Sequence, residues 1–331
     1  MPTKTDFPSS THLARGFHAG EVAVQTRTGA AAKMAELGSR LIRDHMPDQH
    51  RDLFAQLPFV LAGGLDATRQ PWATLLAGPP GFIDTPDAQT LRIAAPPAAP
   101  DALAGAFTSG MPVGLLGIQP HTRRRNRVNG IVTQSDESGF AIRVMESFGN
   151  CPKYIQAREA HYAGPPEQPG RVIETSQLDT ETRRIVTRAD TFFIATAHPD
   201  AGTDAPIAYG VDVSHRGGKP GFVRISETQG ADQLTIPDFT GNSFFNTLGN
   251  IALNPRVGLL FVDFDGGQLV QIAGAATIDH DSPERAHYAG ALRLLHVRID
   301  VVRRLTGVMA LRWGREAELS PHLVATGEWT A

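Results

Sequence analysis

The sequence repeats itself at a spacing of about 140 residues, and this internal similarity constrains the fold more than any other feature. The clearest repeat is the string Val-Gly-Leu-Leu, which occurs at Val113–Leu116 and again at Val257–Leu260. Four further matches keep the same order along the chain: Asn129-Gly130 with Ala273-Gly274, Pro80–Ile83 with Pro220–Val223, Leu91–Ile93 with Leu234–Ile236, and Pro71–Ala73 with Pro206–Ala208. Five matches in one order indicate a duplication; the alternative is two unrelated domains that share a strand-like composition.

Each copy has the pattern of antiparallel β structure. Short apolar runs such as Trp72–Leu76 and Phe192–Ala195 are bounded by Gly, Pro or Asp, which is typical of strands joined by turns. A chain of 331 residues at about 150 residues per domain predicts two domains. No GxGxxG or GxxxxGK[ST] motif occurs. The predicted fold class is therefore mainly β, with two tandem β-barrels and flanking helices.

Domain boundaries follow from helix and linker signals. Residues 1–55 are predicted to form a helical arm, with helices expected at Ala30–Met46 and Asp48–Leu57. The first barrel with a following helix is expected at 56–165, a Pro/Gly linker at 166–178, and the second barrel at 179–331. Within the second barrel, Ser282-Pro283 followed by Glu284 is a helix start, and that helix is expected to reach about Leu295.

Charge and cysteine content exclude several kinds of protein. The formal net charge of −3 argues against a protein built to bind nucleic acid or an anionic membrane. The N-terminal residues contain no apolar run of signal-peptide type, so a cytoplasmic location is expected. A single cysteine, Cys151, excludes an intrachain disulfide, an all-cysteine zinc site and a four-cysteine iron–sulfur cluster.

The two copies differ most in the loops where a ligand would bind. Copy one is almost entirely apolar there, whereas copy two carries hydroxyl, amide and basic side chains. Such groups bind a phosphate monoester, although Gly, Asn, Asp and Ser are also ordinary turn residues. The asymmetry between the copies favours a binding site in copy two, formed by Ser214, Arg216, Lys219, Thr240, Asn242, Ser243, Asn246 and Asn250.

Copy one contributes a basic cluster, His121–Arg127, that leads into a strand. Strand alternation places Arg125 and Arg127 on one face and Arg124 on the other, so half of the cluster is expected to face inward toward an anion. A solvated hairpin and a nucleic-acid patch are the alternatives. In the next segment, Ser147–Gln156, Pro152 suits the first turn of a helix, and Cys151 is expected to serve packing.

Copy two resembles the flavin-nucleotide-binding split-barrel family related to pyridoxamine 5′-phosphate oxidase. The similarity lies in Val213–Val223, Leu234–Asn242, Leu248–Ile251 and Asn254–Phe261. Copy one is similar to a second member of the family. Its Ser147–Gln156 segment is similar to the His-Cys-Pro-Lys helix of single-barrel relatives, with Asn150 in the position of the histidine.

This resemblance implies one FMN site between the two barrels of a fused pseudo-dimer. Copy two would hold the phosphate, and Arg125, Arg127, Asn150 and Lys153 would approach from copy one. The full set of implied cofactor-binding residues is Ser214, His215, Arg216, Lys219, Asp238, Thr240, Asn242, Asn246, Asn250, Arg125, Arg127, Asn150 and Lys153.

The resemblance favours an FMN-dependent oxidoreductase, in which the protein orients the flavin and tunes its redox balance. A small-molecule substrate or electron donor is the expected partner, and the chain is expected to be a monomer or a homodimer. The sequence identifies no general acid or base; His215, His121 and Lys153 are candidates by placement alone. A non-catalytic flavin carrier, sensor or electron-transfer protein is the alternative, and a haem-binding split barrel is a third reading.

Overall fold

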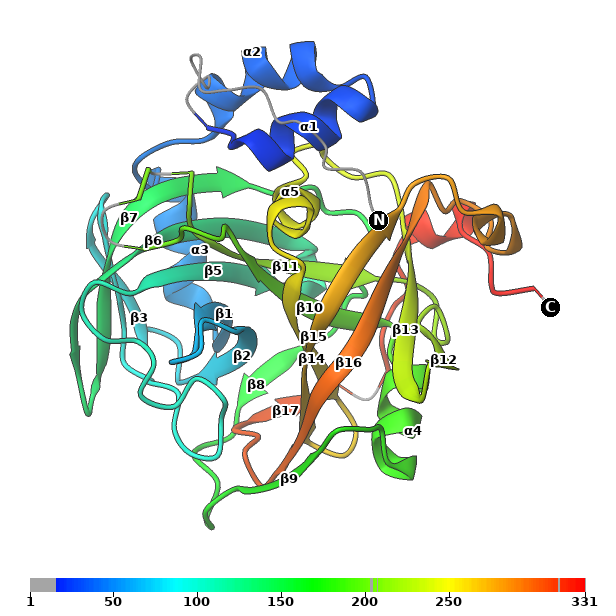
Figure 1. Ribbon diagram of the computed structural model, residues 1–331. Coiled ribbons are helices and arrows are strands. Elements are labelled where there is room, and N and C mark those ends of the chain that lie inside the picture. The colour runs from blue at the N-terminus through cyan, green and yellow to red at the C-terminus, as the bar shows by residue number, and fades with distance from the viewer. Residues whose placement is uncertain (1–15, 203–204, 207, 315, 331) are drawn as a thin grey trace.

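Two antiparallel sheets form the body of the protein, in a computed structural model that describes residues 16–202, 205–206, 208–314 and 316–330 (Figure 1). The strands of the first sheet are β1 (Phe59–Leu65), β2 (Pro71–Ala77), β3 (Ile83–Asp87), β4 (Thr90–Ile93), β5 (Pro112–Gln119), β6 (Arg124–Asp136) and β7 (Gly139–Gly149). Those of the second are β10 (Thr191–Ala197), β11 (Val211–Gly217), β12 (Arg224–Thr228), β13 (Ala231–Asp238), β14 (Arg256–Asp263), β15 (Gln268–Asp279) and β16 (Arg293–Thr306).

The strand order confirms the duplication. The first sheet runs β2-β1-β5-β6-β7-β4-β3 and the second runs β11-β10-β14-β15-β16-β13-β12, so corresponding strands occupy corresponding places. Even the local irregularities repeat, because a β-bulge separates Asn129 from Gly130 in β6 and another separates Ala273 from Gly274 in β15. The predicted mainly β fold of two tandem barrels is therefore correct.

Four of the five sequence matches fall on equivalent strands or turns, and the fifth does not. In the hairpin register, Pro71 at the start of β2 corresponds to Val211 at the start of β11, since Pro71 pairs with Leu65 and Val211 with Ala197. Pro206 and Ala208 precede β11, and position 207 lies outside the described residues. The match of Pro71–Ala73 with Pro206–Ala208 is wrong because a short insertion precedes β11.

Helices cover the ends of the barrels. The helices are α1 (Ala19–Arg27), α2 (Ala31–Leu41), α3 (Asp48–Gln56), α4 (Thr180–Arg188) and α5 (Asn246–Leu253), with short 3-10 turns at Pro120–Thr122, Pro283–His287 and Pro321–Ala325. In Figure 1, α1 and α2 lie at the top of the molecule, and α1 packs on α5. The close approach needs glycine, since a Cβ on Gly20 would lie 2.2 Å from the Gly249 carbonyl oxygen. None of the described helices is long and apolar enough to cross a membrane.

Several predicted helices are shorter than expected or absent. The α2 helix stops at Leu41, because Ile42 is extended and Arg43 pairs with Ser147, whereas α3 matches its prediction within one residue. The helix expected from Ser282 to Leu295 is wrong: only Pro283–His287 is helical, and β16 begins at Arg293. Gly290 between them has a φ of +85°, which ends any helix.

No helix follows the first barrel in the described residues 150–165, so that prediction is also wrong. Tyr154 has a φ of +64°, and the side chain of Gln156 donates to the backbone carbonyls of Asp190 and Gly218 in the second copy. These contacts hold the segment in an irregular path with a turn at Lys153–Tyr154. The expected linker 166–178 contains β9 (Arg171–Thr175), which pairs with β16. A two-stranded sheet of β8 (Ala160–Tyr162) and β17 (Leu311–Trp313) also joins the halves.

The barrels share a hydrophobic core as well as having one each. A cluster between them combines buried side chains of the first copy, such as Leu61 and Leu116, with Phe193, Val213 and Leu260 of the second. Each fully buried aliphatic or aromatic side chain of this kind stabilises the fold by roughly 1.5–3 kcal/mol. The surface between the barrels is thus a folding core, and it holds the two copies in a fixed relation.

Two equivalent glycines set the distance between the barrels. A Cβ on Gly114 in β5 would lie 2.3 Å from the carbonyl oxygen of Val211, and a Cβ on Gly258 in β14 would lie 2.2 Å from that of Pro71. We expect Gly114→Ala or Gly258→Ala to cost about 1–3 kcal/mol of folding free energy, or roughly 2–8 °C in Tm. Thermal unfolding measures this. The control is Gly210→Ala, whose Cβ would meet no atom within 4 Å; equal Tm values for the three variants would contradict the prediction.

Candidate functional site

A pocket opens between the barrels, where β11 and the loop after β13 meet β6 and the loop after β7. Its cavity measures about 110 Å³ and is open to solvent on one side. The first copy lines it with Leu116, Arg125, Arg127, Asn150, Cys151, Lys153 and Tyr154. The second copy lines it with Ser214–Gly217, Phe222, the loop Pro237–Ser243, and Phe245–Leu248 at the N-terminal end of α5.

The structure brings most of the residues predicted from the sequence to this pocket. Arg125 and Arg127 line it from alternate positions of β6, as strand alternation requires, while Arg124 is exposed. Two predicted residues lie elsewhere. Lys219 follows β11 and its amino group lies 3.9 Å from a Glu328 carboxylate oxygen, outside the pocket wall. Asn250 is buried on α5, where it donates to Thr196 and Asp212.

Arginine side chains give the pocket a surplus of positive charge. The half-buried Arg125 makes no side-chain hydrogen bond or ion pair within the described part of the chain, and its Nε is both buried and unpartnered. Burial, with the neighbouring Arg216 and Arg127 guanidinium groups, lowers the pKa of Arg125 to about 9. Arg216 has only a distant acid, since its Nη2 lies 4.0 Å from Asp238 Oδ1. The Asp238 carboxylate also faces Arg293, with Oδ2 at 3.2 Å from Arg293 Nη1.

Arg127 is the innermost cation of the pocket, and its contacts fix the polar back wall. It is 3% exposed and pairs with Asp212, Nη1 to Oδ1, at 2.8 Å. Nη1 also donates to Asn246 Oδ1 at 2.9 Å, and Nη2 donates to the Val213 carbonyl and the Ser214 hydroxyl. A desolvated guanidinium with this many acceptors is a rigid element rather than a mobile surface charge.

Asn246 is oriented by a residue that the sequence did not indicate. Its Nδ2 donates to Glu21 of α1 while its Oδ1 accepts from Arg127, so both ends of the amide are already used. Asn246 therefore holds Arg127 in place, and the second N–H of its amide is left for a ligand. No sequence signal links Glu21 to this site, since 225 residues separate the partners.

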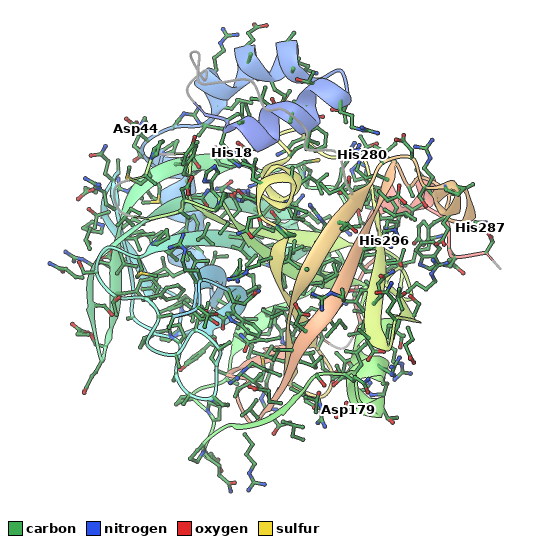
Figure 2. The ribbon with its side chains drawn as sticks, in the orientation of Figure 1. His18, Asp44, Asp179, His280, His287 and His296 are labelled. Atoms are coloured by element: carbon green, nitrogen blue, oxygen red, sulfur yellow. The ribbon has the colours of Figure 1, made fainter. Side chains whose placement is uncertain are left out.

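Behind Arg127 lies a set of buried acids and histidines. Burial, reinforced by Asp212, raises the pKa of Glu21 well above its ordinary value and raises that of Glu146 to about 8. Burial also lowers the pKa of His18 to about 4. His18 begins α1, at the junction of that helix with the sheets (Figure 2). At neutral pH Glu146 is therefore protonated, and Asp212 is the acid that pairs directly with Arg127.

The protonated state of Glu146 predicts a pH dependence of stability. The folded state keeps the Glu146 proton up to about pH 8, whereas the unfolded chain loses it near pH 4.5. The folding stability linked to this proton is therefore present at low pH and is lost as the pH rises through 8. We expect Glu146→Gln to remove a slope of about 1.4 kcal/mol per pH unit. Denaturant unfolding of both proteins between pH 6.5 and 8 measures this, because the histidines titrate alike in wild type and variant and cancel in the comparison. Parallel curves for wild type and variant would contradict the assignment.

Aromatic side chains form the remaining wall. The ring of Tyr154 lies 5.2 Å from that of Phe239, and Arg293 lies over the ring of Phe245 at 5.1 Å. His215 is buried at the pocket, where burial and the adjacent arginines lower its pKa well below the ordinary value, so it is neutral. Sequence reasoning missed Tyr154, Phe239 and Phe245 as wall residues, although each stands next to a predicted polar residue.

Among the known proteins compared, the matches are to solved structures of low similarity. No family model matches the sequence, and no curated protein matches it significantly. HupZ from Group A Streptococcus is 12% identical, with 38% of this chain and 92% of that chain covered and a TM-score of 0.28. A structure titled putative pyridoxamine 5′-phosphate oxidase, from Lactobacillus delbrueckii, is 16% identical, covering 39% and 94%, with a TM-score of 0.28. HutZ, a haem storage protein from Vibrio cholerae, is 13% identical, covering 38% and 89%, with a TM-score of 0.23.

The matched structures are split-barrel proteins of the pyridoxamine 5′-phosphate oxidase type, each spanning about two fifths of this chain. That share corresponds to one of the two barrels. Identities and TM-scores this low assign neither ligand nor activity to the present protein. The assignment of two tandem barrels rests on the repeated strand order itself.

Proposed function

We propose that the protein is an FMN-binding oxidoreductase whose flavin lies in the pocket between the two barrels. One observation carries the proposal. Several guanidinium groups face a pocket that also has aromatic walls, and one of them, that of Arg125, has no side-chain partner among the described residues. FMN combines a phosphate monoester with a flat aromatic ring. Its phosphate suits the arginines of the pocket, and its ring suits the aromatic side chains.

The residues present fit the phosphate group. The unpartnered Nε atoms of Arg125 and Arg127 and the Nδ2 of Asn150 are buried donors that lack acceptors within the described chain. An unsatisfied buried donor costs about 1–3 kcal/mol, and phosphate oxygens would remove that cost. Arg125, Arg216, Lys153, Ser214 and the Thr240–Ser243 loop would hold the phosphate, with Tyr154 and Phe239 beside the ring.

Bound FMN supplies hydride or single-electron transfer. The chain's own residues would bind the flavin and orient it. Arg125 and Arg216 supply the positive charge of the pocket. Arg127 is paired with Asp212, and its bond to Asn246, which in turn donates to Glu21, holds it in one position. His215 is neutral and buried at the pocket wall, where it can accept or share a proton without adding charge. The electron donor and substrate enter from the open side.

Visible absorption of the purified protein, followed by titration of the flavin-free chain with FMN, tests this proposal. Saturable binding of one FMN, with bleaching by NADH or NADPH under anaerobic conditions, is the expected result. Binding without bleaching by any donor would favour a carrier or sensor. A haem spectrum, or failure to bind FMN at all, would overturn the proposal.

A further inference from the structure

The duplication creates a second pocket at the position equivalent to the first. It lies where β2 and the loop after β4 meet β15 and the loop after β16, and its cavity measures about 290 Å³. The correspondence follows from the strand register: Leu75 and Leu76 of β2 take the places of His215 and Arg216, and Leu269 of β15 takes the place of Arg125. The second pocket is therefore also formed by both copies.

The side chains of the second pocket have opposite chemistry to those of the first. No lysine or arginine lines it within the described residues. Ala95, Pro97 and Ala99 after β4 take the places of Asp238, the last residue of β13, and of Thr240 and Asn242 after it. This pocket cannot hold a phosphate, because nothing in its wall would compensate the buried charge.

Its single acid, Asp101, is already satisfied by the protein. Oδ2 accepts from the Thr74 hydroxyl and from Gln271 Nε2, and Oδ1 accepts from the Leu103 amide at 2.8 Å. Burial raises its pKa. Gln271 occupies the position of Arg127 in the other copy, so an amide replaces the guanidinium at the back wall. A cationic ligand would thus find no free carboxylate here.

The pocket has remained open although it has no basic side chains in its described lining. Pro96, Pro97, Pro165 and Pro166 lie in its walls, and proline rings fix the backbone and limit collapse onto an empty space. A dry cavity of about 150 Å³ is enough to bind benzene. A cavity of about 290 Å³ has room for a larger apolar molecule.

We propose that this second pocket binds an uncharged, predominantly apolar small molecule, at a site separate from the FMN pocket. The half-buried Leu75, Tyr162, Val308 and Met309 provide its contact surface. The first pocket takes a charged aromatic ligand and the second a neutral one, so the two copies have diverged in ligand class while keeping the same architecture.

The probe for this site is N-phenyl-1-naphthylamine, an uncharged molecule that fluoresces more strongly in apolar surroundings. We expect saturable binding of one probe per chain, with a dissociation constant of roughly 200 µM or tighter for a ligand of this size. Saturating FMN should leave it unchanged. Ala95→Trp fills the pocket and Met309→Lys places a charge in it, so each should weaken binding at least tenfold while FMN affinity and Tm stay near wild type.

Matched controls are Val324→Trp, which adds the same ring at a side chain that is 90% exposed, and Met309→Leu. If Ala95→Trp does not fold, Met309→Lys alone decides. Absence of saturable probe binding, equal binding in a folded Met309→Lys variant, or displacement of the probe by FMN would each overturn the inference. A chain that binds the probe in this manner but never binds FMN would refute the proposed function and leave the second site standing.

Discussion

Arg125→Glu is expected to reduce FMN affinity about 100-fold without unfolding the protein. The wild-type side chain has no protein partner within the described residues, so its replacement leaves no buried group behind. A charge-assisted hydrogen bond to phosphate is worth about 1.5–3 kcal/mol, and the new carboxylate would also repel the phosphate. Fluorescence titration of the flavin-free chain measures the affinity.

Arg124→Glu is the matched control, because it makes the same change of charge on the neighbouring residue of β6. Arg124 is exposed and does not line the pocket. The FMN affinity of the Arg124→Glu variant should stay within a few-fold of the wild-type affinity. Similar losses in both variants would mean that general charge, rather than the position of Arg125 between the barrels, attracts the ligand.

Arg127→Met is expected to lower the folding free energy by about 3–5 kcal/mol, because it leaves the carboxylate of Asp212 buried and unpaired. Arg127 Nη1 lies 2.8 Å from Asp212 Oδ1, and both side chains are less than 10% exposed. The double variant Arg127→Met with Asp212→Asn removes both charges and should recover most of the loss. Denaturant unfolding of the four proteins forms a double-mutant cycle.

The recovery in the double variant distinguishes the Arg127–Asp212 pair from the other contacts of the guanidinium group. If the double variant is as unstable as Arg127→Met alone, the hydrogen bonds of that group to Asn246, Val213 and Ser214 and its place over the Phe148 ring, at 5.5 Å from the guanidinium carbon to the ring centre, carry the stability. In that case the balance between Arg127 and Asp212 is not what holds the back wall.

The sequence predicted the fold because duplication leaves its pattern in both copies. Matching strands kept matching residues, and the bulge glycines Gly130 and Gly274 stayed at equivalent places because a Cβ there would lie about 2.3 Å and 2.2 Å from backbone oxygens. The same comparison indicated the polar loop of copy two, and strand alternation correctly placed Arg125 and Arg127 on one face. These are local or periodic properties, which a sequence records directly.

Predictions that depended on distant contacts were wrong or missing. The segment Ser147–Gln156 is predicted to begin a helix at Pro152, yet Gln156 bonds to backbone groups 34 and 62 residues away and the segment forms a turn instead. The stretch after Ser282 read as a helix, yet β16 pairs with β13 and β15 from Arg293 onward. Tertiary pairing overrides a weak local preference of this kind.

The sequence by itself determined the two barrels, their common strand order and the polar character of one loop set, because repetition and alternation are written along the chain. Only the tertiary structure decided how those groups are used. In the structure the Asn246 amide bonds to Arg127 and Glu21, and Arg125 has no side-chain partner within the described part of the chain. A pocket without described basic side chains lies at the equivalent position in the other copy. The physical reason is that hydrogen-bond partners and cavities depend on which distant segments meet, and that is set by packing of the whole core.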